Sequence, residues 1–186
     1  MMPGKNTFPG FSNPVAGTEV PLEMLSACHG RIKDQCATLR RLVVHLAAHG
    51  ADDGARIAAR NVMRYFDHAA NDHHADEEQD LFPALLESMA GSDPVCLREM
   101  TAGLTAEHRQ LEALWRRVRA DLQRIGEGES ASLRADAAEE LVALYERHIE
   151  REERELLPMA ARLLSDQDLA RIGRAMRERR GIAEAD

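Results

Sequence analysis

The chain of 186 residues lacks the features of membrane proteins and of disulfide-bonded scaffolds. No segment approaches the roughly 20 consecutive apolar residues that a membrane-spanning helix requires. The three cysteines, Cys28, Cys36 and Cys96, are an odd number without CxxC spacing. This pattern argues against a disulfide framework or a zinc ribbon, and it fits a reducing cytoplasm. The net charge of −8 argues against nucleic acid or an anionic membrane as the main partner.

Aromatic residues make up only 4% of the chain, β-branched residues are few, and no segment alternates apolar with polar side chains. Strands therefore have no support, whereas the abundant Ala, Leu, Arg and Glu favour an all-α fold. Residues 1–17 combine several Pro and Gly with no apolar run. They resemble neither a signal peptide nor a transit peptide, and we predict a flexible N-terminal tail.

Helix-terminating residues divide the remainder into five predicted helices. They run from Thr18–Pro21 to Gly50, from Asp52 or Asp53 to Gly91, from Asp93 and Pro94 to Gly126, from Ser130 or Ser132 to about residue 164, and from Ser165 to Gly181. The first four are joined by short connections, which predict an up-down-up-down four-helix bundle over residues 18–164. Residues 165–181 are expected to form a short extra C-terminal helix packed on it. Pro83 and Pro158 should kink or terminate the second and fourth helices.

Two segments of the predicted second and fourth helices resemble each other: HHADEEQDLFP (73–83) and HIEREERELLP (148–158). In both, a histidine is followed four residues later by a glutamate, which places the two side chains on one helix face. These pairs are His73 with Glu77 and His148 with Glu152. At about 100° per residue, both histidines share the apolar face of their helix.

Two further histidines, His29 and His108, lie on the apolar faces of the first and third predicted helices. His29 lies 21 residues before Gly50 and His73 lies 20 after Asp53, while His108 lies 18 before Gly126 and His148 lies 19 after Glu129. At about 1.5 Å per residue, the members of each pair should meet within a turn of one another. Glu77 lies 14 residues before Gly91 and His108 lies 15 after Asp93, which brings the two pairs to one level of the bundle. The sequence therefore predicts that six inward ligands meet in the core.

Ionised carboxylates buried without partners cost several kcal/mol each, and a divalent cation, or two, would resolve the whole cluster. Histidine with carboxylate suits iron, manganese or zinc. Glu77 and Glu152 could each bridge two metals, with the four histidines as terminal ligands and open positions left for solvent or a small ligand such as O2. A single zinc ion needs only four ligands and would leave the other side chains without a role.

On these residues the sequence resembles the hemerythrin-like, or HHE cation-binding, family. The likeness rests on His29, on the two repeated segments and on His108 within AEHRQLE, and it spans roughly residues 20–165. The resemblance implies a four-helix bundle around a non-haem di-iron centre, in proteins that bind O2, sense oxygen or iron, or act on peroxide or nitric oxide. A ferritin-like centre is less consistent, because its pairs are ExxH and its ligands are mainly carboxylates.

One departure from the family concerns its oxygen carriers, which place a second histidine four residues from the third-helix histidine. Glu112 stands at that distance after His108, and Leu104 stands before it. The seventh ligand is therefore missing or replaced by Glu112, Tyr65, Tyr145 or water. This departure weakens the expectation of reversible oxygen carriage more than that of metal binding.

Other polar residues near the six have simpler interpretations. Glu78 and Glu153 are expected to face solvent or to orient a ligand histidine. His74 should be exposed or adjacent to the ligands, and His45 with His49 should lie on a solvated face. Cys36 should serve in packing.

The most consistent function is that of a cytoplasmic protein whose two carboxylate-bridged irons bind or sense O2, a related small ligand, or iron. The alternatives are a di-iron oxidoreductase acting on peroxide or ferrous iron, and a simple metal store.

Overall fold

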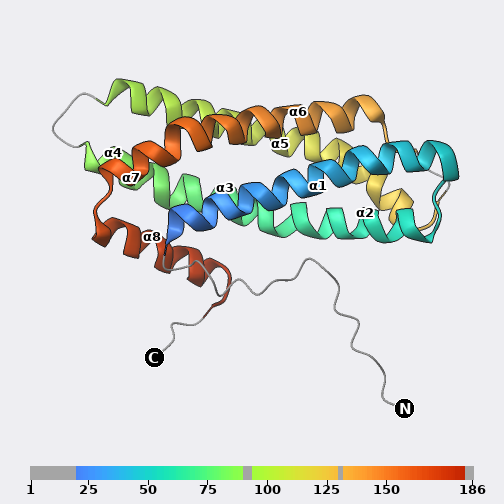
Figure 1. Ribbon diagram of the computed structural model, residues 1–186, viewed down its shortest axis with the longest axis horizontal. Coiled ribbons are helices and arrows are strands. Elements are labelled where there is room, and N and C mark those ends of the chain that lie inside the picture. The colour runs from blue at the N-terminus through green and yellow to red at the C-terminus, as the bar shows by residue number, and fades with distance from the viewer. Residues whose placement is uncertain (1–19, 90–93, 130–131, 183–186) are drawn as a thin grey trace, which may run out of the picture.

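The computed structural model describes residues 20–89, 94–129 and 132–182. Its long helical rods lie side by side in an antiparallel bundle (Figure 1). The first rod is α1 (Pro21–His49), and the third is α5 (Val95–Gly126). The second comprises α2 (Asp53–Tyr65), η1 (Phe66–Ala70), α3 (Asn71–Asp76), η2 (Glu77–Leu81) and α4 (Phe82–Ser88). The fourth comprises α6 (Ala135–Arg151), η3 (Glu152–Leu156) and α7 (Leu157–Leu163). No strand occurs in the described ranges, so the predicted all-α bundle is confirmed.

The helix ends follow the predicted signals at most positions. Gly50 ends α1 with a positive φ of 71°, a conformation that glycine adopts without strain. Asp52 caps α2 by accepting a hydrogen bond from the Ala55 N–H. Ser165 and Asp168 form the capping box of α8 (Asp166–Arg179). The predicted cap at Asp93 and the tail 1–17 lie outside the described residues.

The predicted start of the fourth helix is wrong. Ser132 is not helical, and Ser130 lies outside the described residues; α6 begins at Ala135. Arg134, immediately before it, places its Nε 2.8 Å from Asp121 Oδ2 and directs its backbone N–H to the same oxygen at 3.3 Å. A contact with the preceding helix therefore fixes the turn, and the serines do not cap α6.

Pro83 and Pro158 neither terminate their helices nor leave them as uninterrupted α-helix. Each follows a five-residue π-helical segment, η2 or η3, and occupies the second position of the α-helix that comes next. A π turn carries one extra residue and hydrogen-bonds i to i+5. It thus accommodates a residue that can donate no backbone hydrogen bond, and the rod continues.

The core consists of two apolar clusters at the two ends of the bundle. One includes Leu39, Val62, Val118 and Leu141, and the other includes Leu85, Leu97, Leu157, Ile172 and Met176. Along each rod, residues of the two clusters lie on opposite sides of the predicted ligands: on α1, for example, Leu25 precedes His29 and Ile32 follows it. The polar level is therefore enclosed by hydrocarbon above and below.

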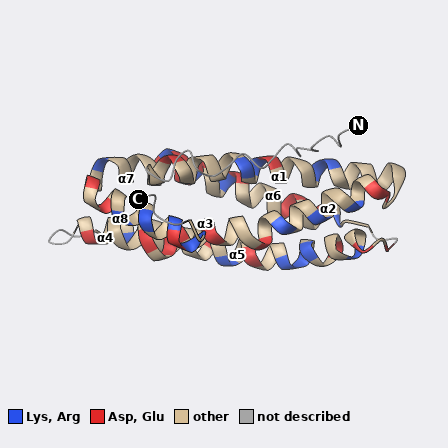
Figure 2. Ribbon diagram, turned by 90° about the horizontal axis from the view of Figure 1, so that it is seen from below, with Lys and Arg blue, Asp and Glu red and all other residues tan. Residues whose placement is uncertain are grey.

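Helix α8 lies across one end of the bundle, against α1 and α3. Its Met176 is fully buried in the second apolar cluster. Two arginines at its C-terminal end, Arg179 and Arg180, pair with Asp76, whose side chain is fully buried. Figure 2 shows acidic and basic residues interspersed along the helices, and it shows both signs together where α8 meets α3. Helix α8 therefore covers this part of the bundle.

Candidate metal centre

All six predicted ligands lie together in the bundle core, each at most 1% exposed. Their ligand atoms form two overlapping groups, in each of which all atoms lie within 4.8 Å of one another. The groups are His29, His73, Glu77 and Glu152, and Glu77, His108, His148 and Glu152. Each group has two imidazoles of its own, and both groups share the same two carboxylates.

Each shared carboxylate directs one oxygen toward each pair of histidines. Glu152 Oε2 lies 3.1 Å from His29 Nε2, and Oε1 of the same group lies 3.0 Å from His148 Nε2. Glu77 Oε1 lies 3.6 Å from His73 Nε2, and its Oε2 lies 3.2 Å from His108 Nε2. This arrangement is the one expected of carboxylates that bridge two neighbouring cations.

Three of the four imidazoles are oriented by carboxylates outside the six. The Nδ1 atoms of His29, His108 and His148 contact Glu153 at 2.6 Å, Glu78 at 2.7 Å and Glu107 at 2.8 Å. A carboxylate can only accept, so each Nδ1 carries a proton, and in the neutral form of the ring, the form that binds a metal, Nε2 presents a lone pair. Such outer partners fix the tautomer of metal-binding histidines.

The inward nitrogens face one another at short range. His29 Nε2 lies 3.1 Å from His73 Nε2, and His108 Nε2 lies 3.1 Å from His148 Nε2. When the rings of His108 and His148 are both neutral, with the proton on Nδ1, the lone pairs on their Nε2 atoms point at each other. Two lone pairs at this distance repel, whereas a cation between them would be bound by both.

The pKa values of the two shared carboxylates are shifted in opposite directions. Burial, and then the neighbouring Glu152, raise the pKa of Glu77 well above its ordinary value. Burial alone would raise the pKa of Glu152, but contacts with the surrounding imidazoles, chiefly His108 and His148, lower it well below the ordinary value. None of the four carboxylate oxygens has a hydrogen-bond partner among the described residues. A pair of cations would satisfy all four, so the donor set fits metal.

The π turns position these two carboxylates. Glu77 is the first residue of η2, and Glu152 is the first residue of η3. The repeated segments thus share a backbone distortion as well as side chains, and π turns of this kind are frequent at functional sites. The sequence signal for these turns is the proline six residues after each glutamate, from which a kink or a helix end is predicted and a π turn is not.

His74 differs from one of its two expectations. It is not exposed: only 6% of it is accessible, and its ring stacks on that of His108 with centroids 4.0 Å apart and planes 14° apart. Rod two passes through η1 just before this residue, and the extra residue in that turn rotates the faces that follow. The ideal angle of about 100° per residue therefore misplaced His74.

Glu107 is a site residue that sequence reasoning missed. It precedes His108, and besides contacting His148 its other oxygen accepts a hydrogen bond from Arg151 at 3.1 Å. Its position next to a predicted ligand was the only available signal. Glu78 and Glu153, by contrast, orient ligand histidines as one of the two interpretations proposed.

The protein candidates for a seventh ligand are engaged elsewhere or lie outside the two groups. Glu112 pairs with Arg109, and the Tyr65 hydroxyl donates to the Cys28 carbonyl at 3.4 Å. Tyr145 is buried, and its ring lies 5.4 Å from that of Phe66.

The residues given simpler interpretations are mostly where expected. His45 lies at the surface with Nε2 3.0 Å from Asp52, and neither it nor His49 belongs to a potential metal group in the described ranges. Cys36 packs in the first apolar cluster. None of the helices in the described part of the chain is long and apolar enough to cross a membrane.

Comparison with known proteins agrees with this geometry. The model of the hemerythrin HHE cation-binding domain matches residues 20–160. An uncharacterised protein of Haemophilus influenzae is 31% identical over 164 residues, which cover 88% of this chain and 92% of that protein. Residues 20–160, which the domain model matches, include all six predicted ligands.

Proposed function

The chain belongs to the hemerythrin HHE cation-binding domain family, and on that premise we propose that its buried centre holds two metal cations bridged by Glu77 and Glu152. The proposed terminal ligands are His29, His73, His108 and His148. The observation that carries this proposal is the division of each carboxylate between the two histidine pairs. A single cation would leave one pair of facing imidazole nitrogens unsatisfied.

Iron is the proposed metal, and manganese or zinc fits less well. Imidazole and carboxylate ligands suit all three ions. Each position offers two imidazoles and two carboxylates, a set that closes a tetrahedral zinc site but leaves a six-coordinate ion open to a further ligand. An iron pair supplies electrons that can be given to O2 and recovered.

The proposed function is therefore to bind or sense O2, a related small ligand, or iron, in the cytoplasm as the cysteine pattern suggests. The residues of the chain contribute in three ways. The imidazoles keep the ligand set largely neutral, the outer carboxylates hold each ring in its tautomer, and the apolar clusters exclude water. A dry, neutral environment disfavours further breakdown of a bound ligand.

An oxidoreductase acting on peroxide or ferrous iron is the second candidate, ahead of a simple metal store. It is supported by a cleft that leads from the surface to the side of the centre and would admit a substrate. Glu112, where an oxygen carrier has a histidine, lines this cleft and supplies no ligand to the two groups.

The test is anaerobic reconstitution with ferrous iron, metal analysis and exposure to air. We expect about two irons per chain and an absorption band that forms in air and disappears under vacuum. Irreversible oxidation, or rapid oxygen release from added peroxide, would favour the enzyme. A stoichiometry of one zinc per chain, with no uptake of iron, would contradict both the proposed O2-binding or sensing function and the oxidoreductase.

A further inference from the structure

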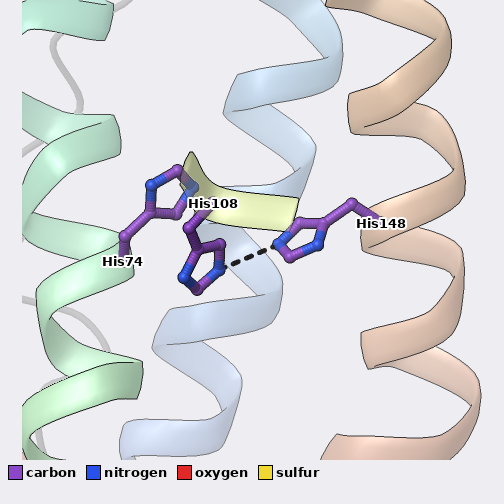
Figure 3. A group of neighbouring side chains, drawn as sticks. All are labelled: His74, His108 and His148. Atoms are coloured by element: carbon purple, nitrogen blue, oxygen red, sulfur yellow. Dashed lines mark hydrogen bonds between the residues drawn. The ribbon is translucent and has the colours of Figure 1, made fainter. Parts of the chain in front are cut away.

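His74 is a buried residue of the centre that the proposed ligand set leaves unused. Both of its ring nitrogens are buried and have no hydrogen-bond partner among the described residues. Figure 3 shows it extending from its helix to lie beside His108, which in turn faces His148. An imidazole that is nine-tenths buried and makes no hydrogen bond calls for a partner that the protein chain does not supply.

His74 also lines a cleft of about 530 Å³ that opens at the surface. The walls come from the second rod and α5, and include Ala75, Trp115 and Arg116. Tyr145 lines the same cleft, and its ring is 6.3 Å from that of His74. His74 is thus one of two cleft-lining residues that contact His108: its ring stacks on that of His108, and Glu78 contacts His108 Nδ1.

The repeated segments show that this feature belongs to one half of the centre only. The residue after His148, which corresponds to His74, is Ile149. Ile149 is fully buried in the first apolar cluster and is absent from the cleft lining. The two otherwise matching segments therefore differ at this position: one carries a cleft-lining imidazole that stacks on His108, and the other carries a buried hydrocarbon side chain.

The orientation of the ring indicates which role His74 can have. A cation bound to His108 Nε2 lies in the plane of that ring. A ring nitrogen of His74 lies within 4.8 Å of ring nitrogens of His108 and His148, so these three residues form a further group that could hold a cation. The His74 ring is, however, stacked on that of His108 in a nearly parallel plane, 14° away with centroids 4.0 Å apart. A cation held in the plane of the His108 ring would therefore lie to one side of the plane of the His74 ring. His74 is placed to contact something bound on the cation rather than the cation itself.

The charge of the loaded centre indicates what that ligand is. Two divalent cations would carry four positive charges, of which Glu77 and Glu152 neutralise two. Of the three outer carboxylates, Glu78 and Glu107 are also paired with Arg109 and Arg151. A net positive charge would therefore remain at the centre, which is enclosed in apolar side chains. An anion entering the centre is therefore favoured electrostatically. The His74 ring carries at least one N–H in either charge state, and neither of its nitrogens has a hydrogen-bond partner among the described residues.

On the basis of the proposed metal centre, we propose that the cleft admits a small monoanion to the His108–His148 side and that His74 donates a hydrogen bond to it. His74 is then a ligand-contacting residue, and the opposite half, with Ile149, has no counterpart.

The test uses azide as the probe and the iron-loaded full-length chain. His74→Ile installs the residue found in the other half, and His74→Gln keeps an N–H donor. His68→Ile, an exposed histidine of the same rod outside the cleft, is the matched control. We expect two irons per chain in all three, azide binding roughly 10–100-fold weaker in His74→Ile, partial recovery in His74→Gln, and no change in the control.

A second variant tests the route without altering His74. Ala75→Trp places a large side chain in the cleft wall, and we expect slower azide association by stopped flow with unchanged iron content. Azide binding unaltered in loaded His74→Ile, or an unaltered association rate in Ala75→Trp, would overturn the inference. Loss of iron from His74→Ile would overturn it in favour of direct ligation. A wild-type chain that takes up no iron would instead refute the proposed function.

Discussion

Glu153 Oε1 lies 2.6 Å from Nδ1 of His29, although the two residues are 124 positions apart in the sequence. The fourth rod therefore orients a histidine of the first, and Glu78 of the second rod orients His108 of the third in the same way, at 2.7 Å. The second glutamate of each repeated segment thus contacts a histidine of the other histidine pair: Glu153 contacts His29, and Glu78 contacts His108.

Glu153→Gln should weaken metal binding roughly 10–100-fold, the usual cost of losing the partner of a metal-binding histidine. The amide is a poorer acceptor and leaves the His29 tautomer undetermined. Metal affinity is measured by competition with a chelator. Glu150→Gln is the control, since Glu150 is exposed and pairs with Arg154 on the solvent side at 2.9 Å; equal losses in both variants would contradict the orienting role.

His73→Ala and His148→Ala should each lower iron content more severely than Glu153→Gln, because each removes a ring nitrogen from the proposed site. His45→Ala should retain the wild-type content, because His45 lies at the surface beside Asp52. Iron per chain is determined by elemental analysis after reconstitution. If all three variants lost iron alike, the assignment of inward and outward histidines would be wrong.

Arg180→Met should destabilise the metal-free protein by about 1–3 kcal/mol, measured by urea unfolding. Arg180 Nη2 lies 2.5 Å from Asp76 Oδ2, whereas Arg179 contacts Oδ1 of the same fully buried carboxylate. In Arg180→Met, Oδ2 therefore loses its partner and cannot recover water. Arg171→Met on the same helix is the control. Its partner Glu87 is exposed, and exposed pairs contribute little. Equal stabilities for the two variants would mean that Asp76 is solvated.

Cys96 should react with an aromatic disulfide reagent at pH 8 in the folded protein, whereas Cys36 should react only after unfolding. Cys96 is exposed, while burial raises the pKa of Cys36 to about 12. The thiolate is the reactive form, and below the pKa its fraction rises about tenfold per pH unit. Any slow native reaction of Cys36, followed in Cys96→Ser, should therefore accelerate as the pH is raised. Rapid labelling of Cys36 at pH 8 would show that the apolar cluster opens.

The six side chains at the centre were predictable because their placement depends on two periodic quantities. Helical angle gives the face, and rise per residue gives the depth, so His29 and His108 could be matched to the repeated segments without any tertiary information. The fold class followed from the same periodicity and from the short connections.

The features that were mispredicted depend on departures from that periodicity or on distant contacts. The π turns at Glu77 and Glu152 add a residue to a turn, and a rule based on an ideal helix treats the following proline as a break. The η1 segment turns His74 inward for the same reason. The start of α6 depends on the contact of Arg134 with Asp121, which is 13 residues away. Glu107 contacts His148, which lies on another helix. Neither contact can be predicted from a local sequence pattern.

The two π turns also constrain how this chain can change in length. Deleting one residue from Glu152–Leu156 would restore an ordinary α-helix at low local cost, but it would rotate everything beyond the deletion by about 100°. Leu157 and Ala160, now packed in the second apolar cluster, would swing toward solvent. Insertions and deletions should therefore be excluded from these two turns and tolerated in the connections between rods, where no register has to be kept.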